Sequence, residues 1–113
     1  MSQSEVDILI DANVQAVVFV MDYLQLQLDV GVVTYTEFPD VVFCGRACTF
    51  GEPDYRNALC DLIGQSILSV TYKEDELFAL NFRDGTITVS LAPEKYTTPE
   101  MVVIDLRNKS IVF

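Results

Sequence analysis

The 113-residue sequence contains no histidine and no tryptophan, and it has seven Lys and Arg residues against seventeen Asp and Glu residues. Without histidine there is no imidazole to act as a general base, which excludes Ser-His-Asp and Cys-His catalytic arrangements. Any reaction would depend on carboxylates, lysine, tyrosine or a lone thiol. We therefore predict no catalytic residues and expect that the chain is not an enzyme.

Cysteine is scarce too, with Cys44, Cys48 and Cys60 only. An odd number of cysteines without an export signal does not favour a disulfide framework, and a four-ligand zinc site would need a carboxylate besides these thiols. Cys60 is expected to pack in the core. Gly45 and Gly51 lack the spacing and the lysine of a phosphate-binding loop. The sequence thus predicts no metal and no cofactor.

Positive charge is missing from the first 45 residues, which hold seven acids and no Lys or Arg. The net charge of the whole chain is -10. Such a field repels phosphate, so neither nucleic acid nor an anionic membrane is an expected partner, whereas a basic protein surface would be attracted. Alternatively, the acidity serves only to keep a rather apolar small protein in solution.

Long apolar runs are absent as well. The longest, Val14 to Met21, is interrupted by Gln15 and is far shorter than the eighteen or so residues of a membrane-spanning helix. Near the N-terminus stand Glu5, Asp7 and Asp11, where a secretory signal would carry Lys or Arg. We expect a cytoplasmic protein.

What the sequence does contain is the same pattern written twice. "YLQLQLDVGVVTYTEF" (Tyr23 to Phe38) and "ELFALNFRDGTITVSL" (Glu76 to Leu91) both alternate apolar and polar residues around a glycine. The surrounding residues match at an offset of 53 or 54, giving repeat units of about 10–38 and 63–91. Each unit reads as three antiparallel strands, with Asp84-Gly85 as a hairpin signal. The expected strands are Val14–Val20, Leu24–Asp29, Val32–Glu37, Ser66–Tyr72, Leu77–Phe82 and Thr86–Leu91.

Three further segments complete the predicted fold. Met101–Leu106 and Ser110–Phe113 suggest one more strand pair, for six to eight strands, and Val41–Phe43 is a separate candidate for an edge strand. A short helix is expected around residues 53–63, with Tyr55, Leu59, Leu62 and Ile63 on one stripe. The prediction is a single domain over residues 1–113, mainly β (α+β), in which two β-meander units form a sheet or sandwich.

The surface offers carboxylates, which can pair with Lys or Arg, and tyrosines, which anchor protein interfaces at little entropic cost. Tyr35 and Tyr72 are instead expected to be core residues. The candidate partner-binding residues lie in the acid-rich first half: Tyr23, Asp29, Glu37, Asp40, Glu52, Asp54 and Tyr55.

The stretch "LIGQSILSVTYKEDELFALNFRDGTITVSL", followed by Pro99-Glu100, resembles small bacterial immunity proteins of polymorphic and contact-dependent growth inhibition toxin systems. The similarity covers Leu62 to about Val103. It implies stoichiometric, non-catalytic capture of a cognate toxin, often a basic nuclease. These immunity families share no common motif, so the resemblance assigns a role to no single residue.

Two alternatives stay open. A small acidic secretion chaperone, or another protein-binding adaptor, would be indicated by an apolar groove and a homodimer, and edge pairing of the sheet into a homodimer is compatible with the sequence. A carboxylate-dependent enzyme would require a deep pocket with converging carboxylates.

Overall fold

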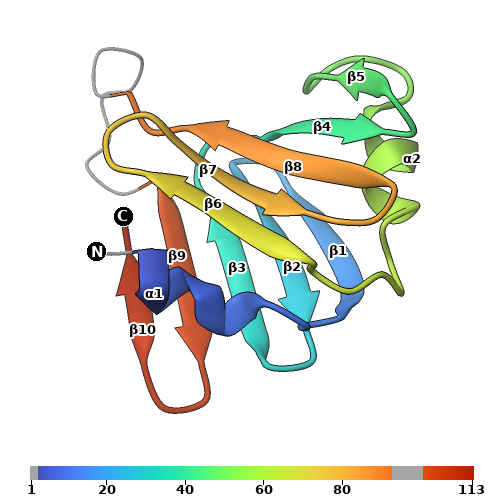
Figure 1. Ribbon diagram of the computed structural model, residues 1–113. Helices are drawn as coiled ribbons and strands as arrows, with labels where there is room; N and C mark the ends of the chain where they lie inside the picture. The colour runs from blue at the N-terminus through green and yellow to red at the C-terminus, as the bar shows by residue number, and fades with distance from the viewer. Residues whose placement is uncertain (1–2, 93–100) are drawn as a thin grey trace.

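The computed structural model describes residues 3–92 and 101–113, so Pro99 and Glu100 of the resembling stretch lie outside the described residues. Two antiparallel sheets of five strands each face one another, in the orders β1-β2-β3-β9-β10 and β5-β4-β8-β7-β6. Figure 1 shows the strands of the two sheets crossing steeply. The predicted fold class, a mainly β single domain, is confirmed.

Ten strands make up the two sheets. The first sheet contains β1 (Val14–Val20), β2 (Tyr23–Leu28), β3 (Gly31–Tyr35), β9 (Val102–Leu106) and β10 (Ser110–Val112). The second contains β4 (Asp40–Phe43), β5 (Arg46–Cys48), β6 (Ser69–Lys73), β7 (Leu77–Asn81) and β8 (Gly85–Ser90). The prediction of six to eight strands was too low because it did not count Val41–Phe43 and did not include β5, whose three residues are too few to show alternation. The expected edge strand Val41–Phe43 is also a misplacement, since β4 lies between β5 and β8.

The helical segments are short: α1 (Gln3–Val6), the 3-10 turn η1 (Asp7–Leu9) and α2 (Tyr55–Cys60). The last is shorter than the predicted helix, because the chain turns after Cys60 and reaches Gly64 at a φ of 93°. Tyr55, Leu59 and Leu62 are buried as predicted, whereas Ile63 is 44% exposed.

The expectation that Cys60 packs in the core is wrong, because its side chain is exposed. One residue after the buried Leu59, it is rotated by about 100° around the helix axis and faces solvent. Among the described residues, no helix is long and apolar enough to cross a membrane.

The two sheets share strands from both halves of the chain. Each three-stranded meander, β1-β2-β3 or β6-β7-β8, stays within one sheet, but the hairpin that follows it crosses to the other sheet. The hairpin β4-β5 pairs with β8, and the hairpin β9-β10 pairs with β3. The crossing is visible in Figure 1, where the green β4 lies beside the orange β8. Each half therefore supplies strands that complete the sheet of the other.

An approximate two-fold axis relates the halves. Asn13 forms a β-bridge with Ser66, its own equivalent at the offset of 53 residues. A residue can pair with its own equivalent only where such an axis passes between them. Two flanking hydrogen bonds, of 3.0 and 2.8 Å, exchange under the same offset: Val14 N to Gln65 O, and Ile67 N to Ala12 O.

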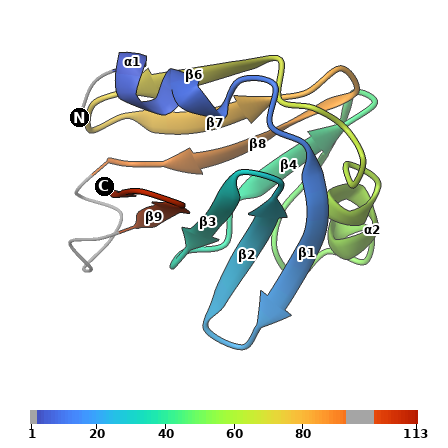
Figure 2. The ribbon, with the colours of Figure 1, turned by 90° about the horizontal axis from the view of Figure 1, so that it is seen from below.

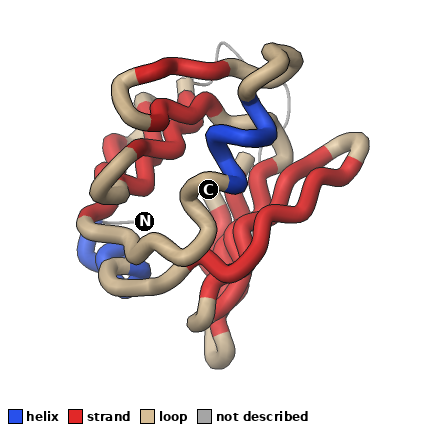
Figure 3. The backbone as a smooth tube through the Cα atoms, turned by 90° about the vertical axis from the view of Figure 1, so that its right-hand side faces the viewer, coloured by secondary structure: helices blue, strands red, loops and turns tan. Residues whose placement is uncertain are grey.

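The core lies between the inner faces of the two sheets. Leu24, Leu26 and Leu28 line the inner face of β2, and Phe78 and Leu80 that of β7, as the alternation predicts. The buried side chains Val6 and Leu9, before β1, and Leu59 and Leu62, before β6, occupy equivalent positions at the offset of 53. Figure 3 shows α2 beside the two sheets, and its contacts with β1 and β4 place it against both.

Two glycines mark the strand exchange. Gly31 begins β3 and Gly85 begins β8, each opposite a strand of the crossing hairpin. A Cβ at Gly31 would collide with the backbone oxygen of Asp105, and one at Gly85 with that of Val42. The sequence predicts Gly85 in a turn, but in the structure it is the first residue of β8. Glycine is needed there because the backbone oxygen of Val42 leaves no room for a Cβ.

We predict that Gly31→Ala and Gly85→Ala each lower the free energy of unfolding by about 1–3 kcal/mol, because the added methyl group pushes the exchanged strands apart. Urea denaturation would measure the loss. Thr86→Ala is the matched control, since Thr86 neighbours Gly85 but has no such collision. Losses for the glycine variants no larger than that of Thr86→Ala would contradict the packing argument.

Candidate functional site

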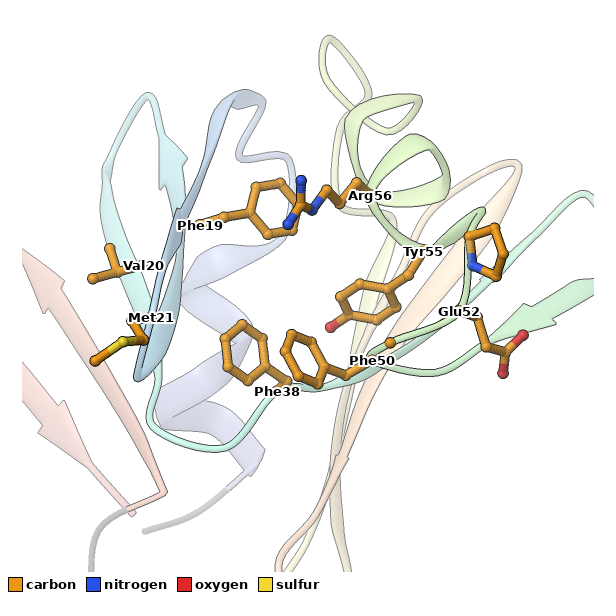
Figure 4. Close-up of a pocket in the computed structure, with 10 residues that line it drawn as sticks. Phe19, Val20, Met21, Phe38, Phe50, Glu52, Tyr55 and Arg56 are labelled. Carbon is orange, nitrogen blue, oxygen red and sulfur yellow. The ribbon is translucent and has the colours of Figure 1, made fainter.

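A groove of about 550 Å³ opens beside α2, between the end of the β1-β2 hairpin and the loops that precede β4 and α2. In Figure 2 the end of this hairpin extends away from the second sheet. We call the hollow the aromatic groove, and Figure 4 shows its lining residues. Its walls are formed chiefly by Phe19, Met21, Phe38, Phe50, Tyr55 and Arg56.

Three aromatic rings form one wall of the groove. The rings of Phe38 and Phe50 stack at 20° with their centroids 4.0 Å apart, and Tyr55 meets Phe50 edge-on at 5.9 Å. The three rings differ in exposure: Tyr55 is 2% exposed, Phe38 is partly buried, and Phe50 is 59% exposed. Phe50 is therefore fixed by its stacking partner and presents most of its ring to solvent, which is a property of interface anchors.

The opposite wall comes from the β1-β2 hairpin. Figure 4 shows Phe19 extending from β1 toward Arg56, whose guanidinium carbon lies 5.8 Å from the centroid of the Phe19 ring. A cation over an aromatic face at an exposed site contributes about 0.5–1 kcal/mol. Met21, in the hairpin turn, is 87% exposed and adds a flexible, polarisable side chain. The groove is thus apolar on both sides.

Two tyrosines in this region are buried, Tyr55 in the groove wall and Tyr35 near Tyr55. Tyr55 donates its hydroxyl to the carbonyl oxygen of Pro39 at 2.5 Å, which ties α2 to the start of β4. Burial raises the pKa of Tyr55, and the nearby Asp40 carboxylate adds to this shift. Burial likewise raises the pKa of Tyr35, whose hydroxyl has no hydrogen-bond partner in the described part of the chain. Both side chains are neutral at ordinary pH.

Carboxylates occur in the segments that build the groove. Glu52 accepts hydrogen bonds from the hydroxyl of Thr49 at 2.6 Å and from its backbone N–H at 3.1 Å, and these bonds hold the pKa of Glu52 below its usual range. Asp54 forms an ion pair of 2.5 Å with Arg46. Asp22 follows Met21, and Glu37 precedes Phe38. Each segment that builds a wall therefore carries an acid.

The structure brings five of the seven predicted partner-binding residues to this end of the molecule. Four are carboxylates in the segments around the groove, and the fifth, Tyr55, is buried and forms part of its aromatic wall. These five are Glu37, Asp40, Glu52, Asp54 and Tyr55.

Tyr23 and Asp29 lie apart from the aromatic groove. Tyr23 stands next to the buried Leu24 on β2, so its side chain is on the outer face of the first sheet. Asp29 follows the other end of β2, where its carboxylate accepts the backbone N–H of Asn13 at 2.9 Å. The predicted seven therefore do not form one surface.

Sequence reasoning missed the groove residues Phe19, Met21, Phe38, Phe50 and Arg56. Phe19 stands in a run of apolar residues in β1, a composition that does not distinguish it from an ordinary core residue. Phe50 offered a signal, since an aromatic residue between Thr49 and Gly51 belongs to no apolar stripe. The contact between Phe38 and Phe50 was beyond prediction, because it depends on how the aperiodic segment between them folds.

We also looked for a second pocket and for a metal-binding cluster outside the aromatic groove. A smaller hollow of about 160 Å³ is lined partly by Arg46, Cys48, Asp54 and Asp61, and Arg46 is paired with Asp54 there. Within residues 3–92 and 101–113, no group of three or more Cys, Asp or Glu side chains could hold a metal ion.

No protein-family model, curated protein or solved structure matches the chain.

We predict opposite effects for two substitutions that each remove one hydroxyl. Tyr55→Phe leaves the Pro39 carbonyl unpaired and should lower the free energy of unfolding by about 1–2 kcal/mol. Tyr35→Phe removes a buried hydroxyl without a partner and should raise it by about 1 kcal/mol. Urea denaturation of both variants would test this, and changes of the same sign would refute the assignment.

The raised tyrosine pKa values predict a loss of stability at alkaline pH. A group whose pKa is higher in the folded state stabilises the fold below its unfolded pKa, here about 10, and this contribution is lost as the pH rises further. The free energy of unfolding should therefore fall above pH 10, and less steeply in Tyr35→Phe. Parallel pH profiles for the variant and the wild type would show that Tyr35 ionises equally in both states.

Proposed function

We propose that the chain is a non-catalytic protein-binding domain, and specifically an immunity protein that binds and neutralises a bacterial toxin in the cytoplasm of the producing cell. The observation that carries the proposal is the aromatic groove, in which exposed Phe50 and Met21 lie in or beside segments that carry carboxylates, and in which hydrogen bonds from Thr49 hold the pKa of Glu52 below its usual range. Apolar anchors in a concave site with a charged rim are typical of protein interfaces.

Charge supports a basic partner. The chain carries a net charge of -10, and Asp22, Glu37 and Glu52 stand in the segments that form the groove. Such a field speeds the encounter with a basic surface, and it repels nucleic acid and anionic lipid. A toxin that itself binds nucleic acid would present a basic surface of this kind.

The groove lacks the arrangement that carboxylate catalysis requires. Glu52 is the one carboxylate residue in its lining, its oxygen is bound by Thr49, and Figure 4 shows its side chain directed away from the hollow. A general acid and base would need two carboxyl groups facing the same substrate. These features support a binding role over an enzymatic one.

A secretion chaperone or other adaptor is the second candidate, and the apolar walls of the groove favour it. Such a protein would hold an extended apolar segment of its client and leave the client's activity intact after release. An immunity protein would abolish the activity of its partner within the complex. Measuring partner activity in the presence of excess chain separates the two roles.

The first experiment is a growth test. Cells would express the C-terminal segment encoded by the neighbouring upstream reading frame, with and without this chain. Growth arrest that coexpression relieves would support immunity and identify the toxin. Arrest that persists despite coexpression, in cells where the chain is folded and abundant, would count against it.

We further predict that paired charge reversal at the groove slows association with the identified toxin. The variant Glu37→Lys with Glu52→Lys should reduce the association rate at least tenfold at about 10 mM salt, where the Debye length is about 30 Å, and less at physiological salt. The matched control is Glu74→Lys with Glu76→Lys, which changes the net charge equally in the turn between β6 and β7. Equal slowing by both variants would show that the whole charge, and not this surface, steers the toxin.

A further inference from the structure

Four strands lie at sheet edges in the described part of the chain, and three of them are protected. The edge strands β5 and β10 have three residues each, and β6 carries Lys73. Short strands and lysines keep other chains from pairing with an edge. The fourth edge strand, β1 (Val14–Val20), has seven residues and no charge. Its only irregularity is a register shift near its beginning, between Val14 and Ala16.

The edge of β6 is also closed by a side chain. Gln3 donates its amide N–H to the backbone oxygen of Val70 at 2.6 Å, and its amide oxygen accepts the backbone N–H of Tyr72 at 3.0 Å. A primary amide has the donor and acceptor of a peptide group. Gln3 therefore occupies the place that an added strand would take on β6.

The corresponding edge on β1 has no such cap. At the offset of 53 residues, Val70 and Tyr72 correspond to Val17 and Phe19, and Gln3 corresponds to Arg56. The Arg56 guanidinium lies over the Phe19 ring, and a guanidinium has no acceptor for the N–H of Phe19. The two-fold symmetry thus breaks at the residue that closes the edge.

The free backbone groups on β1 belong to Val17 and Phe19. Val20 and Tyr23 enclose a two-residue turn, which makes them a hydrogen-bonded pair. Since hydrogen-bonded and non-hydrogen-bonded pairs alternate along an antiparallel ladder, Phe19 and Val17 direct their N–H and C=O groups away from β2. Within the described residues these donors and acceptors have no hydrogen-bond partner; α2 contacts β1, and the aromatic groove opens beside Phe19, where that helix begins.

The groove continues this edge on the inner side of the sheet. The Phe19 side chain forms one of its walls, and a strand added along β1 would lie about 4.8 Å from Phe19. Alternate side chains of that strand would point toward Phe50 and Tyr55. At about 550 Å³ the groove has the size of sites that hold drug-sized molecules, about 300–1,000 Å³, and has room for large apolar side chains.

We propose that an extended segment of the partner protein adds to β1 as a sixth strand of the first sheet. It pairs with the backbone groups of Val17 and Phe19 and seats an apolar side chain in the aromatic groove. Lys or Arg side chains in the same segment face the surrounding acids. This inference rests on the protein-binding function proposed above, and it specifies the shape and chemistry of what is bound.

Charge selects a basic partner segment over a second copy of this chain. Asp22, Glu37 and Glu52 accompany the walls of the groove, and a second β1 would bring the same acids to meet them. The strand itself has no Lys or Arg to offset that repulsion. A basic segment with alternating apolar residues would place its apolar side chains in the groove and its Lys or Arg side chains near these acids.

A random dodecapeptide library displayed on phage, selected against the full chain, tests the proposal. We expect enriched peptides with a large apolar residue and with Lys or Arg at alternating positions. The best peptide, synthesised and added at saturation, should slow hydrogen exchange of the Val17 and Phe19 amides at least tenfold. No enrichment, or protection elsewhere in the chain, would overturn the proposal.

The two-fold axis supplies a matched pair of variants. Arg56→Gln places at the β1 edge the residue type that closes the β6 edge, whereas Arg56→Ala removes the same charge without a cap. The Gln variant should bind the selected peptide at least tenfold more weakly than the Ala variant. Equal affinities would show that the peptide does not use this edge. In the free protein, Gln3→Ala should speed hydrogen exchange at Tyr72 and leave Phe19 unchanged.

The outcomes also separate this inference from the proposed function. If the chain neutralises its toxin while the toxin leaves the Val17 and Phe19 amides unprotected, strand addition is wrong and immunity stands. If these amides become protected with rising concentration of the chain alone, together with a dimer in sedimentation, a second copy occupies the edge and the proposal is overturned.

Discussion

The pairing of β3 with β9 and of β4 with β8 is the contact on which the rest of the structure depends. Without it, each half of the chain is a three-stranded meander and a detached hairpin, with one apolar face open to water. The exchange turns these pieces into two five-stranded sheets that bury a common core. It also explains why Gly31 and Gly85 begin strands, since each permits a close approach of the crossing hairpin.

The same two-fold symmetry explains where the candidate site lies. Gln3 and Arg56 hold equivalent positions before the two meanders, yet one closes a sheet edge and the other stacks on an aromatic ring. The aromatic groove lies at the end where closure is missing. Phe50 contributes because the loop after β5 carries its ring onto Phe38. The proposed binding surface thus lies where the second half of the pattern departs from the first.

Much of the fold could be predicted because it depends on local alternation. The spacing of Leu24, Leu26 and Leu28 is enough to predict which face of the strand is buried, and Asp84-Gly85 indicates the hairpin that follows β7. The partner of each hairpin could not be predicted, since β4 contacts β8 across more than forty residues. For the same reason, only part of the candidate site could be predicted. Acids such as Glu37 and Glu52 are visible in composition, whereas the stacking of Phe38 on Phe50 depends on three-dimensional packing.

The strand exchange has a consequence for how the protein is made on the ribosome. When β4 leaves the exit tunnel, about forty more residues must emerge before its partner β8 does. About seventy residues separate β3 from its partner β9. At about 5–20 residues per second, these delays are of the order of several seconds. The nascent first half therefore exposes unpaired apolar strands until β8 and β9 have emerged. Chaperone binding during synthesis is the expected cost of distributing each sheet over both halves of the chain.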